Sequence, residues 1–166
     1  PKSISWDAVK ALGHDEMPAH GLVPVTVPGA PGAWAALSER FGKLPFEQLL
    51  APAIELADEG FAVSPVVSQL WKSAEKRYGQ YETAEFTPWF SHFTTNGHAP
   101  KAGDIWRSPD MAKTLSEIAS SKADAFYQGN LADAMDAFSR EHGGFLRKED
   151  LAAYRPEWVD PISVRY

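Results

Sequence analysis

The stretch Val27-Pro28-Gly29-Ala30-Pro31-Gly32-Ala33-Trp34 decides how this sequence is interpreted. Its prolines and glycines interrupt the chain and then begin a helix, because proline at the first helical position loses no hydrogen bond. Trp34, Leu37 and Phe41 follow at the spacing of one helical face. We therefore expect a helix that starts in this motif and directs these three side chains, Trp34 among them, into the core.

The pattern continues outward as further helices. The clearest amphipathic face lies after Pro45, in a segment that Pro52 should bend. Its apolar residues are Phe46, Leu49, Leu50, Ala53, Ile54 and Ala57. Ser64-Pro65 and Ser108-Pro109-Asp110 each combine an N-cap residue with a proline in the first turn, which predicts two more helices. Another is expected over residues 123–142, with an interruption at Gly129-Asn130.

Two segments have strand-like patterns instead. Leu22 to Val27 reads as extended, and its proline confines it to a sheet edge or to a non-sheet stretch. Ile162, Val164 and Tyr166 alternate at period two, which is typical of a strand. Because isolated strands are not stable, both would lack partners. The predicted fold class is mainly α, with five or six helices.

Composition excludes several classes of function. A chain of 166 residues allows one domain. The net charge of −6, with 16 Lys and Arg scattered among 22 acidic residues, argues against a nucleic-acid partner. The absence of cysteine removes disulfides, thiolate metal ligands and a cysteine nucleophile. No run approaches the roughly 18 apolar residues that a membrane span needs.

Histidines are the candidate metal ligands, but their spacing matches neither one helical face nor a zinc finger. The residues are His14, Asp15, Glu16 and His20 in one cluster, with His92 and His98 repeating the same spacing. We interpret them as polar loop residues and expect no metal site.

Thr94-Thr95-Asn96-Gly97 contains a candidate nucleophile. A threonine that uses its own α-amine as the base must stand at a chain N-terminus, whereas these threonines are internal. Asn-Gly is above all a turn signal. We therefore expect a turn between two extended pieces.

Three other candidates are weak. Gly29 to Gly32 resembles an anion-binding turn but lacks the lysine of a phosphate loop. Glu47 and Asp58 have no demonstrable pairing geometry for glycoside hydrolysis. Trp71, Trp89, Trp106 and Trp158 are expected to pack rather than to stack on ligands. We assign no catalytic, substrate-binding or metal-binding residue.

Several strings, in order, resemble the γ-glutamyltranspeptidase family. They are Val27–Trp34, Glu39–Pro45, Leu50–Ala57, Glu59–Ser64, Pro100–Asp104, Thr114-Leu115 with Ile118-Ala119, Asp124–Gly129, and Gly143-Gly144 with Glu149–Tyr154. The resemblance covers nearly the whole chain from Val27 onward.

The resemblance implies a longer parent enzyme with the αββα fold of the N-terminal nucleophile hydrolases. Such enzymes cleave their own precursor to expose a threonine, which attacks a γ-glutamyl amide such as glutathione, without a cofactor. Residues 1–166 then correspond to the helical middle of the large subunit, with no complete second domain. The substrate arginine lies upstream, and the nucleophile lies in the small subunit, the expected partner.

The abrupt ends at Pro1 and Tyr166 fit the expectation that the sequence is a piece of a longer protein. By itself the piece is expected to be inactive. The alternatives are a fragment of a cephalosporin-acylase-like amidohydrolase and a non-enzymatic helical interaction module. The compartment stays open, although periplasmic or secreted proteins are typical of the family.

Overall fold

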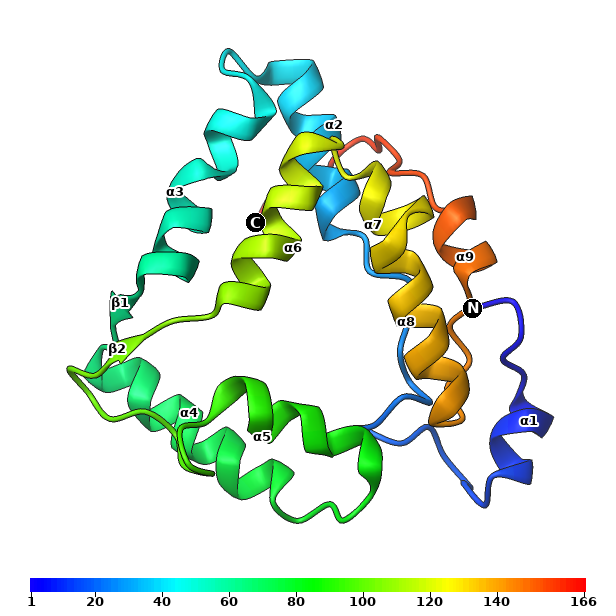
Figure 1. The fold of residues 1–166 in the computed structure, drawn as a ribbon. Coiled ribbons are helices and arrows are strands. Elements are labelled where there is room, and N and C mark those ends of the chain that lie inside the picture. Colours follow the sequence, from blue (N-terminus) through cyan, green and yellow to red (C-terminus); the bar gives the residue numbers. More distant parts are fainter.

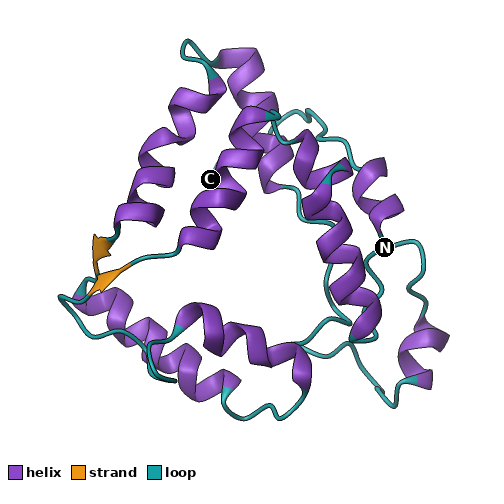
Figure 2. Cartoon of the chain, viewed as in Figure 1, coloured by secondary structure: helices purple, strands orange, loops and turns teal.

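The computed structural model describes residues 1–166, and nearly all of its regular structure is helical (Figures 1 and 2). The helices are α1 (Trp6–Ala11), α2 (Ala30–Phe41), α3 (Phe46–Glu59), α4 (Pro65–Tyr78), α5 (Thr87–Phe93), α6 (Pro109–Ser120), α7 (Asp124–Gln128), α8 (Asn130–Glu141) and α9 (Lys148–Ala153), with a 3-10 turn, η1, at Ala84–Phe86. Strands β1 (Phe61–Ala62) and β2 (Ile105–Trp106) form one antiparallel pair. The mainly α prediction is confirmed.

The helices form three sides of a triangle (Figure 1). One side is α3 packed along α6, the second is α4 with α5, and the third is α7, α8 and α9. Only 19 of the 166 residues are buried, so the three sides do not close around one common core. None of the helices has the length and apolar character that crossing a bilayer requires.

The main core cluster lies where α6, α7, α8 and α9 meet. Its buried members are Phe46, Ile118, Ala123, Tyr127, Ala132, Leu146 and Leu151. Val25 and Val27 pack against this cluster from the segment that precedes α2. The segment before the proline–glycine motif is therefore fixed by packing rather than by pairing in a sheet.

Tyr127 of α7 holds the first turn of α2. Its hydroxyl donates to the Pro28 carbonyl oxygen at 2.8 Å and accepts from the Gly32 N–H at 3.0 Å. In an uninterrupted α-helix, the N–H of residue 32 would bond directly to the carbonyl of residue 28. The hydroxyl thus stands between the two groups and satisfies both, at a helix start where Gly29 offers no side-chain cap.

Tyr154, just after α9, completes the contact. Its ring stacks on Tyr127 with centroids 5.1 Å apart, and its hydroxyl donates to the Gly29 carbonyl oxygen at 3.3 Å. A Cβ on Gly29 would lie 2.6 Å from this hydroxyl, and one on Gly32 would lie 3.0 Å from the ring. Both glycines are required because the tyrosines approach the backbone this closely.

A second motif organises the turn between α8 and α9. Gly143 has a φ of 72°, in the left-handed region that favours glycine. The Arg147 guanidinium donates to the Gly144 carbonyl oxygen at 2.7 Å. The Asp150 carboxylate accepts from the Arg147 N–H at 3.0 Å and from the Lys2 N–H at 2.8 Å. Asp150 therefore caps α9 and ties the N-terminal segment to it.

The predicted core face of α2 is wrong. Trp34, Leu37 and Phe41 are 43%, 48% and 63% exposed, whereas Pro31 and Gly32 are the buried residues of this helix. The two tyrosines pack on the small residues of α2, which turns its bulky apolar face outward. The pattern on α3 is only partly buried, since Phe46 is in the core and Leu49 is 45% exposed.

Neither of the two strand-like segments forms a strand. Residues 22–27 belong to no strand, which leaves only the non-sheet alternative. Residues 160–166 have no partner strand, and Ile162 and Tyr166 are fully exposed. The observed strands instead join two segments distant in sequence, with Phe61 opposite Trp106.

Helix number and boundaries agree in part with the sequence. The structure has nine helices rather than five or six, because the sequence does not resolve short helices such as α5. The predicted interruption is confirmed, since Gly129 separates α7 from α8.

Tyr127→Phe is expected to lower the free energy of unfolding by about 1–3 kcal/mol, because it leaves the Gly32 N–H and the Pro28 carbonyl without their partner. Urea denaturation measures this. Tyr154→Phe is the matched control and should cost less, since its hydroxyl makes one bond of 3.3 Å. Equal stability of Tyr127→Phe and the unaltered protein would contradict the assignment.

Candidate functional site

The candidate threonines lie on a tight hairpin turn. The Thr95 N–H donates to the His98 carbonyl oxygen at 2.9 Å, and the His98 N–H donates back at 3.2 Å. Asn96 and Gly97 occupy the two turn positions with φ of 54° and 80°. The predicted turn is confirmed. The Thr94 hydroxyl donates to the Phe90 carbonyl oxygen at 2.6 Å.

His92 and Asp110 border the same hollow as these threonines. The distance between His92 Nδ1 and Asp110 Oδ2 is 3.7 Å, and both side chains are mostly exposed. A nucleophile is activated by a base within hydrogen-bond reach, which a third group orients. No threonine hydroxyl is bonded to His92, so the three residue types do not form an activated nucleophile.

The structure separates the histidines from one another. His20 Nδ1 lies 3.1 Å from the Tyr81 hydroxyl, and His98 Nδ1 lies 3.2 Å from Glu75 Oε1. His14 stands with its acidic neighbours in the loop after α1. No three His, Asp or Glu side chains gather closely enough to bind one ion.

The glycine turn before α2 lacks two of the four N–H groups that could bind an anion. Pro31 has no N–H, and the N–H of Gly32 is committed to Tyr127. Anion sites at helix starts depend on several free N–H groups that point at the ligand. The turn therefore serves as a packing surface for the tyrosines.

The remaining candidates are structural or far apart. Glu47 and Asp58 both lie on α3, eleven residues apart, which corresponds to about 16 Å along a helix.

The tryptophans have protein partners, as expected for packing residues. Trp71 contacts Trp106 at 4.8 Å between ring centroids, Trp89 contacts Tyr78 at 5.0 Å, and Trp158 lies under the Arg40 guanidinium at 4.3 Å.

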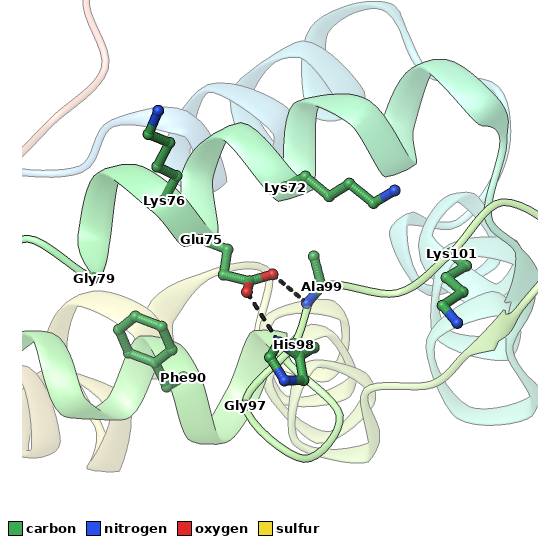
Figure 3. A pocket seen from close by; sticks show the side chains of 9 residues that line it. All are labelled: Lys72, Glu75, Lys76, Gly79, Phe90, Gly97, His98, Ala99 and Lys101. Carbon is green, nitrogen blue, oxygen red and sulfur yellow. Dashed lines mark hydrogen bonds and ion pairs between the residues drawn. The ribbon is translucent and has the colours of Figure 1, made fainter.

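Glu75 of α4 is a polar centre that the sequence did not indicate (Figure 3). Its carboxylate accepts from the Ala99 N–H at 2.6 Å and faces His98 Nδ1 at 3.2 Å. These contacts hold the pKa of Glu75 below the ordinary carboxyl value, chiefly through the Ala99 hydrogen bond and then through His98. Ser68 adds a buried bond from its hydroxyl to the Pro100 carbonyl oxygen at 2.9 Å.

The hollow beside Glu75 is bordered by three lysines, Lys72, Lys76 and Lys101. Figure 3 shows that their side chains point in different directions and do not converge on one position. The charges therefore form no shared cradle for an anion. Glu75 instead fastens the segment after the hairpin turn to α4.

An apolar groove lies between the first two sides of the triangle. It is lined by Ala53, Leu56, Ala57, Phe61, Trp71, Phe93, Trp106, Ser108, Met111 and Leu115. Leu56 and Met111 are about half exposed, at 53% and 44%. Large exposed apolar patches mark contact surfaces in soluble proteins.

Glu75 makes the stability pH-dependent with a definite sign. The pKa of Glu75 is lower in the folded protein than in the unfolded chain. As the pH falls below 4.5, the unfolded chain therefore binds a proton at Glu75 before the folded protein does. The free energy of unfolding decreases with falling pH until the folded protein is protonated too. Glu75→Gln should flatten the loss of unfolding free energy below this pH, as followed by urea titrations. Glu82→Gln, at an exposed position after α4, should keep the original slope. An unchanged slope in Glu75→Gln would contradict the role of the carboxylate.

The whole chain matches a known family. A family model described as gamma-glutamyltranspeptidase matches residues 1–166. The glutathione hydrolase proenzyme of Pseudomonas aeruginosa is 36% identical over 146 residues, which are 86% of this chain and 25% of that protein. The glutathione hydrolase-like YwrD proenzyme of Bacillus subtilis is 31% identical over 99% of this chain and 30% of its own length.

Solved structures agree. The crystal structure of cephalosporin acylase from Bacillus halodurans has 50% identity and a TM-score of 0.96, over all of this chain and 31% of that one. Helicobacter pylori gamma-glutamyltranspeptidase has 31% identity and a TM-score of 0.82, over 92% of this chain and 43% of that one. The chain spans about a quarter to a third of the curated relatives it matches. With the family model matched from end to end, the chain belongs to the γ-glutamyltranspeptidase family.

Proposed function

We propose that the chain is part of the large subunit of an N-terminal nucleophile hydrolase that cleaves γ-glutamyl amides such as glutathione. The family match over residues 1–166 is the observation that carries this proposal. A threonine outside residues 1–166 attacks the amide carbonyl, and the acyl group passes to water or to an amino acid. Relatives named glutathione hydrolase proenzymes support this substrate class.

Residues 1–166 supply a helical frame and no catalytic residue in this proposal. The small subunit of the same precursor is the partner, and the reaction uses no cofactor. Thr94 and Thr95 are not the nucleophile in this proposal, because both are internal to the chain and have no α-amine to act as the base. Membership of an enzyme family favours this reading over a non-enzymatic helical module.

A cephalosporin-acylase-like activity is the second candidate. It is favoured by the 50% identity to the Bacillus halodurans acylase and by the 33% identity to the Acylase ACY 1 proenzyme of a Pseudomonas strain. A glutaryl amide differs from a γ-glutamyl amide in lacking the α-amino group. The two candidates therefore share one carbonyl chemistry and differ in how the acyl chain is recognised.

The full-length protein is expected to release the chromophore from a γ-glutamyl anilide, whereas residues 1–166 alone should not exceed the buffer rate. Residues 1–166 contain neither the proposed nucleophile nor its oxyanion donors, so nothing in them can attack the amide carbonyl or stabilise the resulting oxyanion. The glutaryl anilide, assayed in parallel, distinguishes the acylase: release from this substrate alone would favour the second candidate.

Thr95→Ala in the full-length protein is the control and should keep the original rate. Loss of activity in Thr95→Ala, with unfolding unchanged, would overturn the exclusion of this threonine. Failure of the processed full-length protein to cleave either anilide would overturn the proposed function.

A further inference from the structure

The Asn96-Gly97 turn leaves its backbone open to reaction. Both residues are exposed at the tip of the hairpin, and apart from the two neighbouring residues no atom lies within 4 Å of the position where a Gly97 side chain would begin. The Gly97 N–H makes no hydrogen bond, because the two bonds of the turn belong to Thr95 and His98. The backbone nitrogen next to the Asn96 amide is therefore both uncovered and uncommitted.

We propose that Asn96 is a deamidation site whose product releases the segment that Glu75 holds. In the first step, the Gly97 backbone nitrogen attacks Asn96 Cγ. The bond from Cγ to the side-chain nitrogen breaks, and ammonia leaves with the proton of the Gly97 nitrogen. The product is a five-membered succinimide that includes the backbone.

Water then opens the ring at one of its two carbonyl carbons. Opening at one carbon gives aspartate with the original backbone, and opening at the other gives isoaspartate, in which the backbone runs through the side-chain methylene. The sum of the steps is the exchange of ammonia for water. No other reactant is needed.

The isoaspartate product is incompatible with the observed turn. A two-residue hairpin connection fixes the register of the flanking residues, and one additional backbone carbon changes the length of that connection. His98 and Ala99 follow the turn directly, and both contact Glu75, at 3.2 Å and 2.6 Å. Displacement of the turn is therefore expected to break the hydrogen bond between the Ala99 N–H and the Glu75 carboxylate.

The chain holds an internal control, because Asn130 is its one other asparagine. Asn130 begins α8 and is followed by Leu131. A leucine side chain hinders attack by the adjoining backbone nitrogen, whereas glycine has none. Asn130 is exposed like Asn96, so the two asparagines differ chiefly in the residue that follows them.

The test is peptide mass mapping of the full-length protein during incubation in neutral and mildly alkaline buffer. We expect Asn96 to lose its amide at least about tenfold faster than Asn130, because Gly97 has no side chain to hinder attack by its backbone nitrogen, whereas Leu131 has one. The rate at Asn96 should rise with pH, since the deprotonated nitrogen is the nucleophile. Equal rates at the two asparagines would overturn the site assignment.

Hydrogen exchange at Ala99 tests the consequence. The separated isoaspartate fraction should lose the slow exchange of the Ala99 N–H, whereas Asn96→Asp should keep it. The substitution adds the charge without lengthening the backbone, so it isolates the effect of the additional carbon. Slow exchange at Ala99 in the isoaspartate fraction would overturn the link to Glu75.

Discussion

The hydroxyl of Tyr127 is the contact on which the arrangement of α2 depends. It donates to the Pro28 carbonyl oxygen at 2.8 Å and accepts from the Gly32 N–H at 3.0 Å, two groups at this helix start that no intrahelical bond satisfies. Burial raises the pKa of this hydroxyl, so it stays protonated and able to donate. With Tyr154 stacked beside it, the proline–glycine motif is joined to α7 and to the segment after α9.

The contact between the two tyrosines and the proline–glycine motif brings together three of the segments that resemble the family, although these segments lie far apart in the sequence. The motif at residues 27–34 supplies the glycines, Asp124–Gly129 supplies Tyr127, and Glu149–Tyr154 supplies the second ring. The Gly143-Gly144 pair and Asp150 then set the turn that brings Tyr154 into place. These segments therefore form one packing arrangement rather than separate sites.

The same contact accounts for the open shape of the chain. Small residues of α2 face the tyrosines, so Trp34 and Phe41 remain outside. The apolar groove and the exposed tail from Trp158 to Tyr166 add further uncovered apolar surface. Under the proposed function, other parts of the enzyme would cover these surfaces, since the chain spans a quarter to a third of its curated relatives.

Sequence patterns predicted where helices begin and end better than they predicted which helix faces are buried. Proline and glycine signals act locally, so the starts of α4 and α6, the break at Gly129 and the Asn96-Gly97 turn were all predictable. Which face of a helix is buried depends on what packs against it, and the tyrosines that cover Gly29 and Gly32 lie about a hundred residues away in the chain. The Glu75 contacts and the pairing of β1 with β2 are equally non-local, and no periodicity indicates them.

Hydrogen exchange at the Gly32 amide tests the central claim most directly. This N–H is expected to exchange slowly in the unaltered full-length protein and much faster in Tyr127→Phe, whereas Ala33, whose N–H donates to the Gly29 carbonyl oxygen at 3.0 Å, should change less. Unchanged slow exchange at Gly32 in Tyr127→Phe would show that the helix start forms without the tyrosine and would contradict the account.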